Sequence, residues 1–252
     1  MFAERRRRRQ LRERGFDDEW RDVLERRMPM WRTLDDRERA GVESRALDLI
    51  AGVRWEASRG FEITDEVRVL VAAQVGLMGL ELPDDSFARV RVVIVHPTSM
   101  VLEGEHETLE GFTSDEPLHL SGQAEYDGPV MLAWDDVVDE ARHPGDGNNV
   151  VFHEFAHKLD MNTGSINGTP PITDSALLDR WVDACTAAFE LVGSGGGGYS
   201  LPDDAADEPG EFFAAATEAF FDCGDVLRDE HPALYEVFAE YFGQDPAARF
   251  AD

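Results

Sequence analysis

The stretch Asn148–Asp160, NNVVFHEFAHKLD, places two histidines four residues apart among apolar side chains. Positions i and i+4 of an α-helix lie on one face, so His153 and His157 can present two imidazole nitrogens to one metal ion. Glu154 points about 100° away from His153 and can reach a water molecule on that ion. This HExxH spacing predicts a zinc site with Glu154 as the catalytic base.

The apolar neighbours predict that this helix is buried and holds the two histidines rigidly. Asn148 or Asn149 is the expected N-cap residue, and the chain is expected to turn away at Gly164. A chance match is the alternative, since roughly two chains in a hundred of this composition would contain the pattern. The histidines would then be core residues, but three polar groups in an apolar helix favour the metal site.

A catalytic zinc usually has three protein ligands and one open position. The third ligand is expected in Glu208–Gly224, EPGEFFAAATEAFFDCG. In a helix that begins near Gly210, Glu211 and Glu218 share a face with only alanines between them, which allows close approach to the histidine helix. Either glutamate could bind the metal, and the other would then support a histidine. The alternative is an amphipathic helix whose glutamates face solvent.

Length and composition predict one soluble domain. The chain has 252 residues, of which 42% are hydrophobic and 10% aromatic, enough for one sizeable core. We expect an arginine-rich, mobile arm at residues 1–14 and a single domain at 15–252, helical up to about residue 90 and catalytic beyond it. The formal charge of -28 argues against nucleic acid or an anionic membrane as a partner.

The location of the protein is predicted from its apolar segments. No apolar run follows the N-terminal arginines, as it would in a secretory signal peptide. No segment reaches the roughly 18 apolar residues of a membrane span. We therefore expect a cytoplasmic protein.

Periodicity predicts an α+β, predominantly helical fold. Residues 17–58 have helical spacing with a break at Pro29, and an almost wholly apolar helix is expected from Asp65. The alternating, β-branched ARVRVVIVHP at 88–97 is typical of a strand. Residues 116–134 predict a hairpin whose second arm is Val130–Trp134, and helices are expected after it.

Two segments resemble the Mlc titration factor family of bacterial zinc-dependent peptidases. They are GPVMLAWDDVVDEARHPGDGNNVVFHEFAHKLDMNTGSINGTPPI, Gly128–Ile172, and PGEFFAAATEAFF, Pro209–Phe221. HEFAHKLD, NGTPP and the EFFA helix occur in order at fitting separations. The resemblance covers most of the chain and implies a zincin-like, gluzincin-type metallopeptidase fold related to the catalytic domain of anthrax lethal factor, with a small sheet beside the HExxH helix.

The resemblance also implies roles for individual residues. It assigns one zinc per chain to His153, His157 and Glu211, and makes Glu218 a supporting residue. The family carries a tyrosine, thought to stabilise the oxyanion, seven residues before the glutamate ligand, where this chain has Asp204. An ionised carboxylate cannot donate a hydrogen bond, so we expect weakened activity. Tyr199 is a candidate substitute, or an ordinary loop residue.

Two functions follow from the motif and the resemblance. The first is aminopeptidase-like hydrolysis of short peptides by a zinc-activated water. The second is a zinc-stabilised binding protein that sequesters a transcription regulator, with weak or vestigial peptidase activity. The segment PVMLAW, Pro129–Trp134, is expected to be either an edge strand that pairs with an extended substrate or a core strand.

Overall fold

The N-terminal third of the protein is a layer of helices. The computed structural model describes residues 6, 9, 11, 13–102, 106, 107, 113, 114 and 118–249. The helices of this layer are α2 (Asp18–Arg27), α3 (Met30–Thr33), α4 (Asp36–Gly52) and α5 (Asp65–Met78). Asp35 begins α4 with a capping box that it forms with Glu38. Every residue from Val69 to Met78 in α5 is buried, as its apolar sequence predicts.

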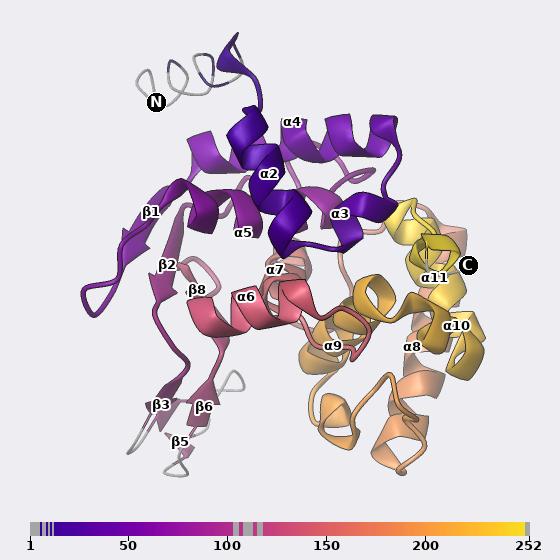
Figure 1. Ribbon diagram of the computed structural model, residues 1–252. Helices are drawn as coiled ribbons and strands as arrows, with labels where there is room; N and C mark the ends of the chain where they lie inside the picture. Colours follow the sequence, from indigo (N-terminus) through magenta and orange to yellow (C-terminus); the bar gives the residue numbers. More distant parts are fainter. Residues whose placement is uncertain are drawn as a thin grey trace.

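The remaining helices follow the sheet strands in the chain. They are α6 (Trp134–Arg142), α7 (Val150–Asp160), α8 (Ser175–Gly193), α9 (Pro209–Asp222), α10 (Gly224–Glu230) and α11 (Pro232–Phe242), with short 3-10 turns η1 (Met161–Thr163), η2 (Asp203–Ala206) and η3 (Pro246–Arg249). Figure 1 shows the purple N-terminal helices above and the orange to yellow C-terminal helices to one side. Helix α7, which carries the HExxH motif, contacts α5, α6 and α9 and the sheet. The motif therefore lies where the parts of the fold meet.

A four-stranded sheet lies beside α7. Its order is β1 (Arg54–Ala57), β2 (Val92–His96), β8 (Val130–Ala133) and β7 (Gly122–Ala124). Strands β1, β2 and β8 are parallel, and β7 pairs antiparallel with β8 through Gln123 opposite Met131. Short pairs also form between β3 (Met100–Leu102) and β6 (Leu118–Leu120), and between β4 (His106–Glu107) and β5 (Thr113–Ser114). The fold is thus predominantly helical with a small mixed sheet.

Two details of the predicted elements were wrong. Residues 54–57 lie within the stretch predicted to be helical, but they form β1, because α4 ends at Gly52 and Arg54 pairs with Val92 far along the chain. The predicted hairpin arm Val130–Trp134 ends at Ala133, where α6 begins. The hairpin itself, the strand in 88–97 and the helix from Asp65 are confirmed.

The segment PVMLAW is a core strand and not an edge strand. Strand β8 pairs with β2 on one side and with β7 on the other, and Val130 and Leu132 are fully buried. The edge of the sheet next to β8 is β7 instead. Any extended substrate that joined this edge would therefore pair with β7.

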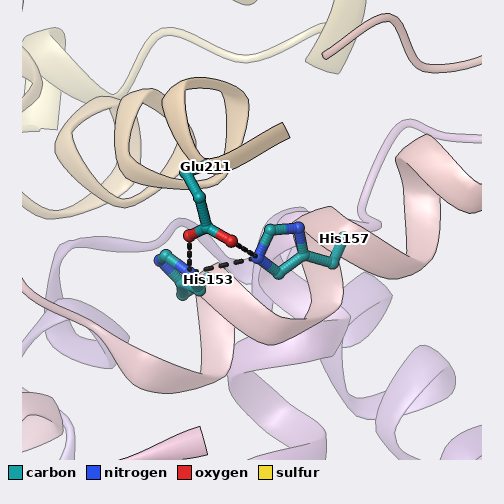
Figure 2. A group of neighbouring side chains, drawn as sticks. All are labelled: His153, His157 and Glu211. Carbon is teal, nitrogen blue, oxygen red and sulfur yellow. Dashed lines mark hydrogen bonds and ion pairs between the residues drawn. The ribbon is translucent and has the colours of Figure 1, made fainter. Parts of the chain in front are cut away.

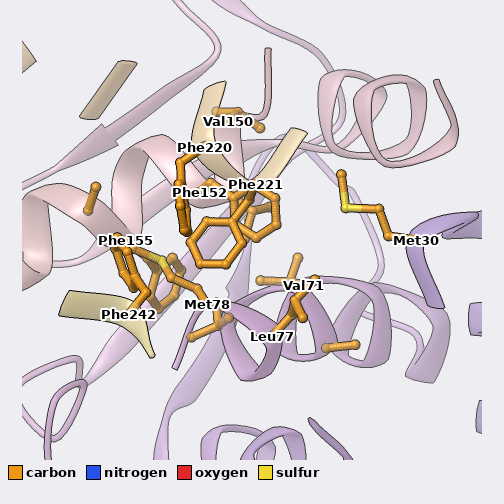
Figure 3. Close-up of a cluster of buried hydrophobic side chains, with 14 of the residues drawn as sticks. Met30, Val71, Leu77, Met78, Val150, Phe152, Phe155, Phe220, Phe221 and Phe242 are labelled. Atoms are coloured by element: carbon orange, nitrogen blue, oxygen red, sulfur yellow. The ribbon is translucent and has the colours of Figure 1, made fainter. Parts of the chain in front are cut away.

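One hydrophobic cluster runs from Phe16 to Ala247 and joins the helices to the sheet. Phe220 and Phe221 of α9, Phe152 and Phe155 of α7 and Phe242 of α11 gather above α5 (Figure 3). Phe220 stacks on Phe242 with ring centroids 5.5 Å apart. This aromatic packing fixes α7 and α9 relative to one another.

Two predictions about the chain as a whole stay predictions. Most of the predicted arm, residues 1–5, 7, 8, 10 and 12, lies outside the described residues. The division into an arm and a single domain likewise stays a prediction.

In the part of the chain that the structure describes, no helix has both the length and the apolar character to cross a bilayer.

The aromatic cluster predicts a large loss of stability for Phe220→Ala. Phe220 is fully buried, and truncating such a ring costs about 3–5 kcal/mol because a cavity remains. Urea unfolding measures this loss. The control is Leu191→Ala, whose side chain is 46% exposed and whose truncation should change stability by less than about 0.5 kcal/mol. Equal effects of the two changes would contradict this account of the core.

Candidate metal centre

The start of α7 is held by its cap residue Asn149 and by side chains from two other helices. The Asn149 side chain accepts a hydrogen bond from the backbone N–H of Phe152 (3.0 Å) and donates one to Gln74 of α5 (2.8 Å). The Val150 N–H donates to Glu140 of α6 (2.6 Å). These bonds satisfy N–H groups that every helix leaves free at its start. Asn149, one of the two caps considered, is therefore the N-cap residue.

The two histidines of α7 and Glu211 of α9 point toward one another (Figure 2). The Nε2 atoms of His153 and His157 are 3.1 Å apart. Glu211 places Oε2 3.1 Å from His153 Nε2 and Oε1 3.4 Å from His157 Nε2. Within the described chain, these three residues form a group whose ligand atoms all lie within 4.8 Å of one another. The structure thus brings together the two histidines of the motif and Glu211, the one of the two candidate glutamates that the family resemblance implied as a ligand.

Close contact between α7 and α9 makes this arrangement possible. Ala214 and Ala216 of α9 are fully buried, and Phe152 of α7 packs on Phe221 of α9 with ring centroids 5.0 Å apart. Pro209 at the first position of α9 lacks the N–H that would otherwise be unpaired there. Glu211 therefore sits in the first turn of α9, with its side chain aimed at α7.

Glu218 supports His153 from behind. Its Oε1 lies 2.6 Å from His153 Nδ1, and its Oε2 accepts the backbone N–H of Asn149 (2.6 Å). A carboxylate on Nδ1 fixes the imidazole orientation and leaves Nε2 facing Glu211 and His157. The two glutamates of α9 thus take different positions. Glu211 faces both Nε2 atoms, and Glu218 lies on the far side of one ring.

The charges of the site reinforce one another. Burial acts to lower the pKa of His153, but Glu218 and Glu211 outweigh it and raise that pKa well above its ordinary value. Burial acts to raise the pKa of Glu211, but its hydrogen bonds to His153 and His157 hold that pKa well below the usual range. Glu211 is therefore an anion at neutral pH. The cluster favours a cation between these groups, either a proton or a metal ion that competes with it.

Glu154 lies beside this cluster without joining it. Its side chain is 5% exposed, and burial raises its pKa, which favours the protonated form. Its Oε2 has no hydrogen-bond partner among the described residues, and neither has His157 Nδ1. A buried polar atom without a partner is costly. Glu154 is therefore a buried carboxyl group close to the candidate ligands, with one oxygen that has no partner among the described residues.

Asp160 and Asp204 lie in quite different settings. Asp160, fully buried at the end of α7, accepts backbone N–H groups from Gly168 (2.8 Å) and Thr169 (3.2 Å) and holds the NGTPP loop against the helix. Asp204 is exposed in η2. Tyr199 is 63% exposed, and its backbone N–H donates to Glu230 (3.0 Å). The role suggested for Tyr199 at an oxyanion stays a prediction.

Three contacts around the site have no signal in the local sequence. Glu140 reaches the first N–H of α7 from another helix, and Gln74 reaches its cap. Lys158, which follows His157, points to the turn between β7 and β8. Lys158 is the only lysine of the chain, but its rarity does not indicate what it contacts. The other two depend on contacts between residues far apart in sequence.

The loop before α7 depends on a buried aspartate. The Asp222 Oδ2 atom accepts the backbone N–H groups of Gly145 (2.8 Å) and Gly147 (2.9 Å). Both glycines have positive φ angles, 113° and 84°, which favour glycine. Burial raises the pKa of Asp222 to about 7. The end of α9 thus shapes the loop that leads into the metal helix.

Comparison with known proteins places this site in a family. A family model described as glucose-regulated metallo-peptidase M90 matches residues 2–243. The chain belongs to this family. The resemblance that HEFAHKLD and EFFA indicate is thereby confirmed, and membership implies a metal ion for which His153, His157 and Glu211 are a possible site.

The relatives with curated names cover nearly the same length. Mlc titration factor A of Edwardsiella ictaluri is 32% identical over 228 residues, which are 88% of this chain and 86% of that protein. The protein of the same name from Serratia proteamaculans is 31% identical over 237 residues, 92% of this chain and 88% of its own. An uncharacterized protein of Synechocystis is 29% identical over 245 residues, which are 95% of this chain and 89% of that protein.

The bond between Glu218 and His153 predicts the effect of Glu218→Gln. The neutral amide orients the imidazole less strongly, so metal affinity should fall about 10–100-fold. Competition with a chromophoric chelator for a divalent metal ion measures the change. Glu236→Gln, at an exposed position of α11, serves as the control. Unchanged affinity in the Glu218 variant would contradict the supporting role.

The burial of Asp222 predicts a pH-dependent effect of Asp222→Asn. The unfolded chain releases this proton near pH 3.8 and the folded protein near pH 7, so wild-type stability falls as the pH rises between these values. Asparagine does not ionise. From pH 5 to pH 8 the variant should therefore gain more than about 1 kcal/mol in unfolding free energy relative to wild type.

Urea unfolding of both proteins at the two pH values measures this gain. Asp183→Asn, at an exposed position of α8, is the control, and its difference from wild type should not change with pH. A pH-independent difference for Asp222→Asn would show that the folded protein ionises Asp222 as readily as the unfolded chain does.

Proposed function

We propose that this protein is a zinc-dependent peptidase that hydrolyses short peptides in an aminopeptidase-like reaction. The spacing of the three candidate ligands carries the proposal. Two ligand atoms held tetrahedrally at about 2.0–2.1 Å from a zinc ion lie about 3.3 Å apart. The two Nε2 atoms are 3.1 Å apart. Glu211 Oε2 lies 3.1 Å from Nε2 of His153, and Glu211 Oε1 lies 3.4 Å from Nε2 of His157. One zinc ion per chain fits between them.

Each residue then has a defined part in hydrolysis. His153, His157 and Glu211 would hold the ion, and Glu218 would keep His153 in place. A bound zinc ion would supply Lewis acidity, which lowers the pKa of a bound water to about 7 and polarises a peptide carbonyl. Glu154 would accept the proton of the attacking water and pass it to the leaving amine.

The surroundings of the site support a zincin-like arrangement. Helix α7 packs against β7 and β8, and β7 is the antiparallel edge of the sheet next to the motif. A free edge can bind an extended peptide through main-chain hydrogen bonds, which suits substrates of varied sequence. Asp204 stands where the family tyrosine is expected, so we expect slow turnover.

A second function is favoured by the relatives and by Asp204. The relatives named Mlc titration factor A point to binding of a regulator, Mlc, by those proteins. In this chain the same site could stabilise a binding protein that sequesters a transcription regulator. An exposed carboxylate at Asp204 in place of a hydrogen-bond donor fits a site with little remaining catalysis.

The decisive experiment compares wild type with Glu154→Gln. We expect elemental analysis to find one zinc per chain in both, because Glu154 is not a ligand. Hydrolysis of a panel of fluorogenic aminoacyl and short-peptide substrates should fall at least about 100-fold in the variant, because glutamine cannot carry the proton. Zinc in both proteins without turnover by wild type would reject the peptidase and favour the regulator-binding function. Equal turnover in both would exclude Glu154 as the base.

A further inference from the structure

The hairpin formed by β7 and β8 is fastened to the metal helix at its turn. Lys158, one residue after His157, is 5% exposed. Its Nζ donates hydrogen bonds to the carbonyl oxygens of Glu125 and of Gly128, the latter at 3.1 Å. Both carbonyls belong to the turn that joins β7 to β8. A buried ammonium group thus links α7 to this turn through two charge-assisted bonds.

The same hairpin touches Glu154 at the beginning of β7. A Cβ atom added to Gly122 would lie 2.5 Å from Glu154 Oε1 and 2.6 Å from its Cγ. Such distances are far below van der Waals contact, so only glycine fits without displacing one of the two groups. The backbone of β7 therefore rests directly on the side chain of the proposed base.

These two contacts fix the distance between β7 and α7 and the position of β7 along the helix. Lys158 holds the turn at one end of the strand, and Gly122 sets the approach at the other. Among the described residues β7 pairs only with β8, so its other edge has backbone groups that point away from the sheet. The position of this edge relative to Glu154 depends on both contacts.

We propose that Lys158 and Gly122 are positioning residues that dock edge strand β7 on the metal helix and so align the main chain of an extended peptide with Glu154. The role in substrate alignment rests on the peptidase function proposed above; the docking itself does not. Neither residue contacts the candidate metal ligands or supplies a proton, although Gly122 lies against the side chain of Glu154. They act through the backbone of β7 and through the side chain of Glu154.

The chemistry of both residues suits this role. A lysine side chain is long enough to reach two carbonyls of a turn, and its three N–H donors need no special geometry. Removing it would leave these carbonyls without their buried donor, which costs more than the bonds contribute. Glycine allows the closest approach of a backbone to a neighbouring group.

The first test compares Lys158→Met with Lys158→Arg. Methionine keeps the apolar stem and removes the donor, whereas arginine keeps a buried cation. Hydrogen exchange followed by mass spectrometry should show amides of residues 122–128 exchanging about tenfold or more faster in the methionine variant. Zinc content should match wild type in both, and arginine should restore much of the protection. Wild-type exchange in Lys158→Met would overturn the docking role.

Peptide hydrolysis then tests alignment. With the most rapidly cleaved substrate of the panel, Lys158→Met should raise KM and lower kcat/KM about tenfold or more, because a loosened edge strand binds the peptide main chain poorly. Equal kcat/KM in variant and wild type, with faster exchange in the hairpin, would overturn the alignment role. Exchange is measured without turnover, so failure of the peptidase proposal leaves the docking test intact.

The second test is Gly122→Ala, with Gly193→Ala as the control. A Cβ at Gly193, at the end of α8, meets its nearest neighbour at an ordinary 3.6 Å. Gly122→Ala should keep its zinc, speed exchange of the residue 122–128 amides and lower kcat about tenfold or more, because the new methyl group displaces Glu154 or lifts β7. Exchange and kcat equal to those of the control would overturn the role of Gly122.

Discussion

The contact of the Glu211 carboxylate with the Nε2 atoms of both histidines is the constraint that the surrounding fold has to satisfy. It brings together helices α7 and α9, whose contacting residues are 58 positions apart. Whether the two imidazoles and the carboxylate attract or repel one another depends on which of them carry protons. Their positions must therefore be set by the rest of the fold. The buried aromatic rings between the two helices and α11 provide that rigidity.

A second layer of polar contacts keeps α7 in place. Glu218, Glu140 and Gln74 come from three helices and converge on the first turn of α7. Each satisfies a buried donor, so the cost of burying these polar groups is offset within the network. The end of α9 extends this layer through Asp222 to the loop before α7. The site is therefore held at its start by side chains and at its end by the NGTPP loop on Asp160.

The sheet contributes a different kind of control. Its central strands β2 and β8 each pair with a strand on either side, while β7 lies at the edge next to Glu154. The hairpin contacts of Lys158 and Gly122 connect this edge to the same helix that carries the candidate ligands. Two of the three candidate metal ligands, the proposed base and the contacts that hold the edge strand thus all lie on or against α7.

The sequence by itself determined the local features: the helix with His153 and His157 on one face, its asparagine cap, the buried helix from Asp65 and the hairpin between residues 122 and 133. These follow from periodicity and capping, which act within a few residues. Only the tertiary structure decided that Glu211 and not Glu218 faces both Nε2 atoms, that residues 54–57 form a strand, that β7 and not PVMLAW is the edge, and that Lys158 holds the hairpin. The physical reason is that these features arise from pairing and packing between segments far apart in the chain. A local sequence pattern does not indicate which distant segments come into contact.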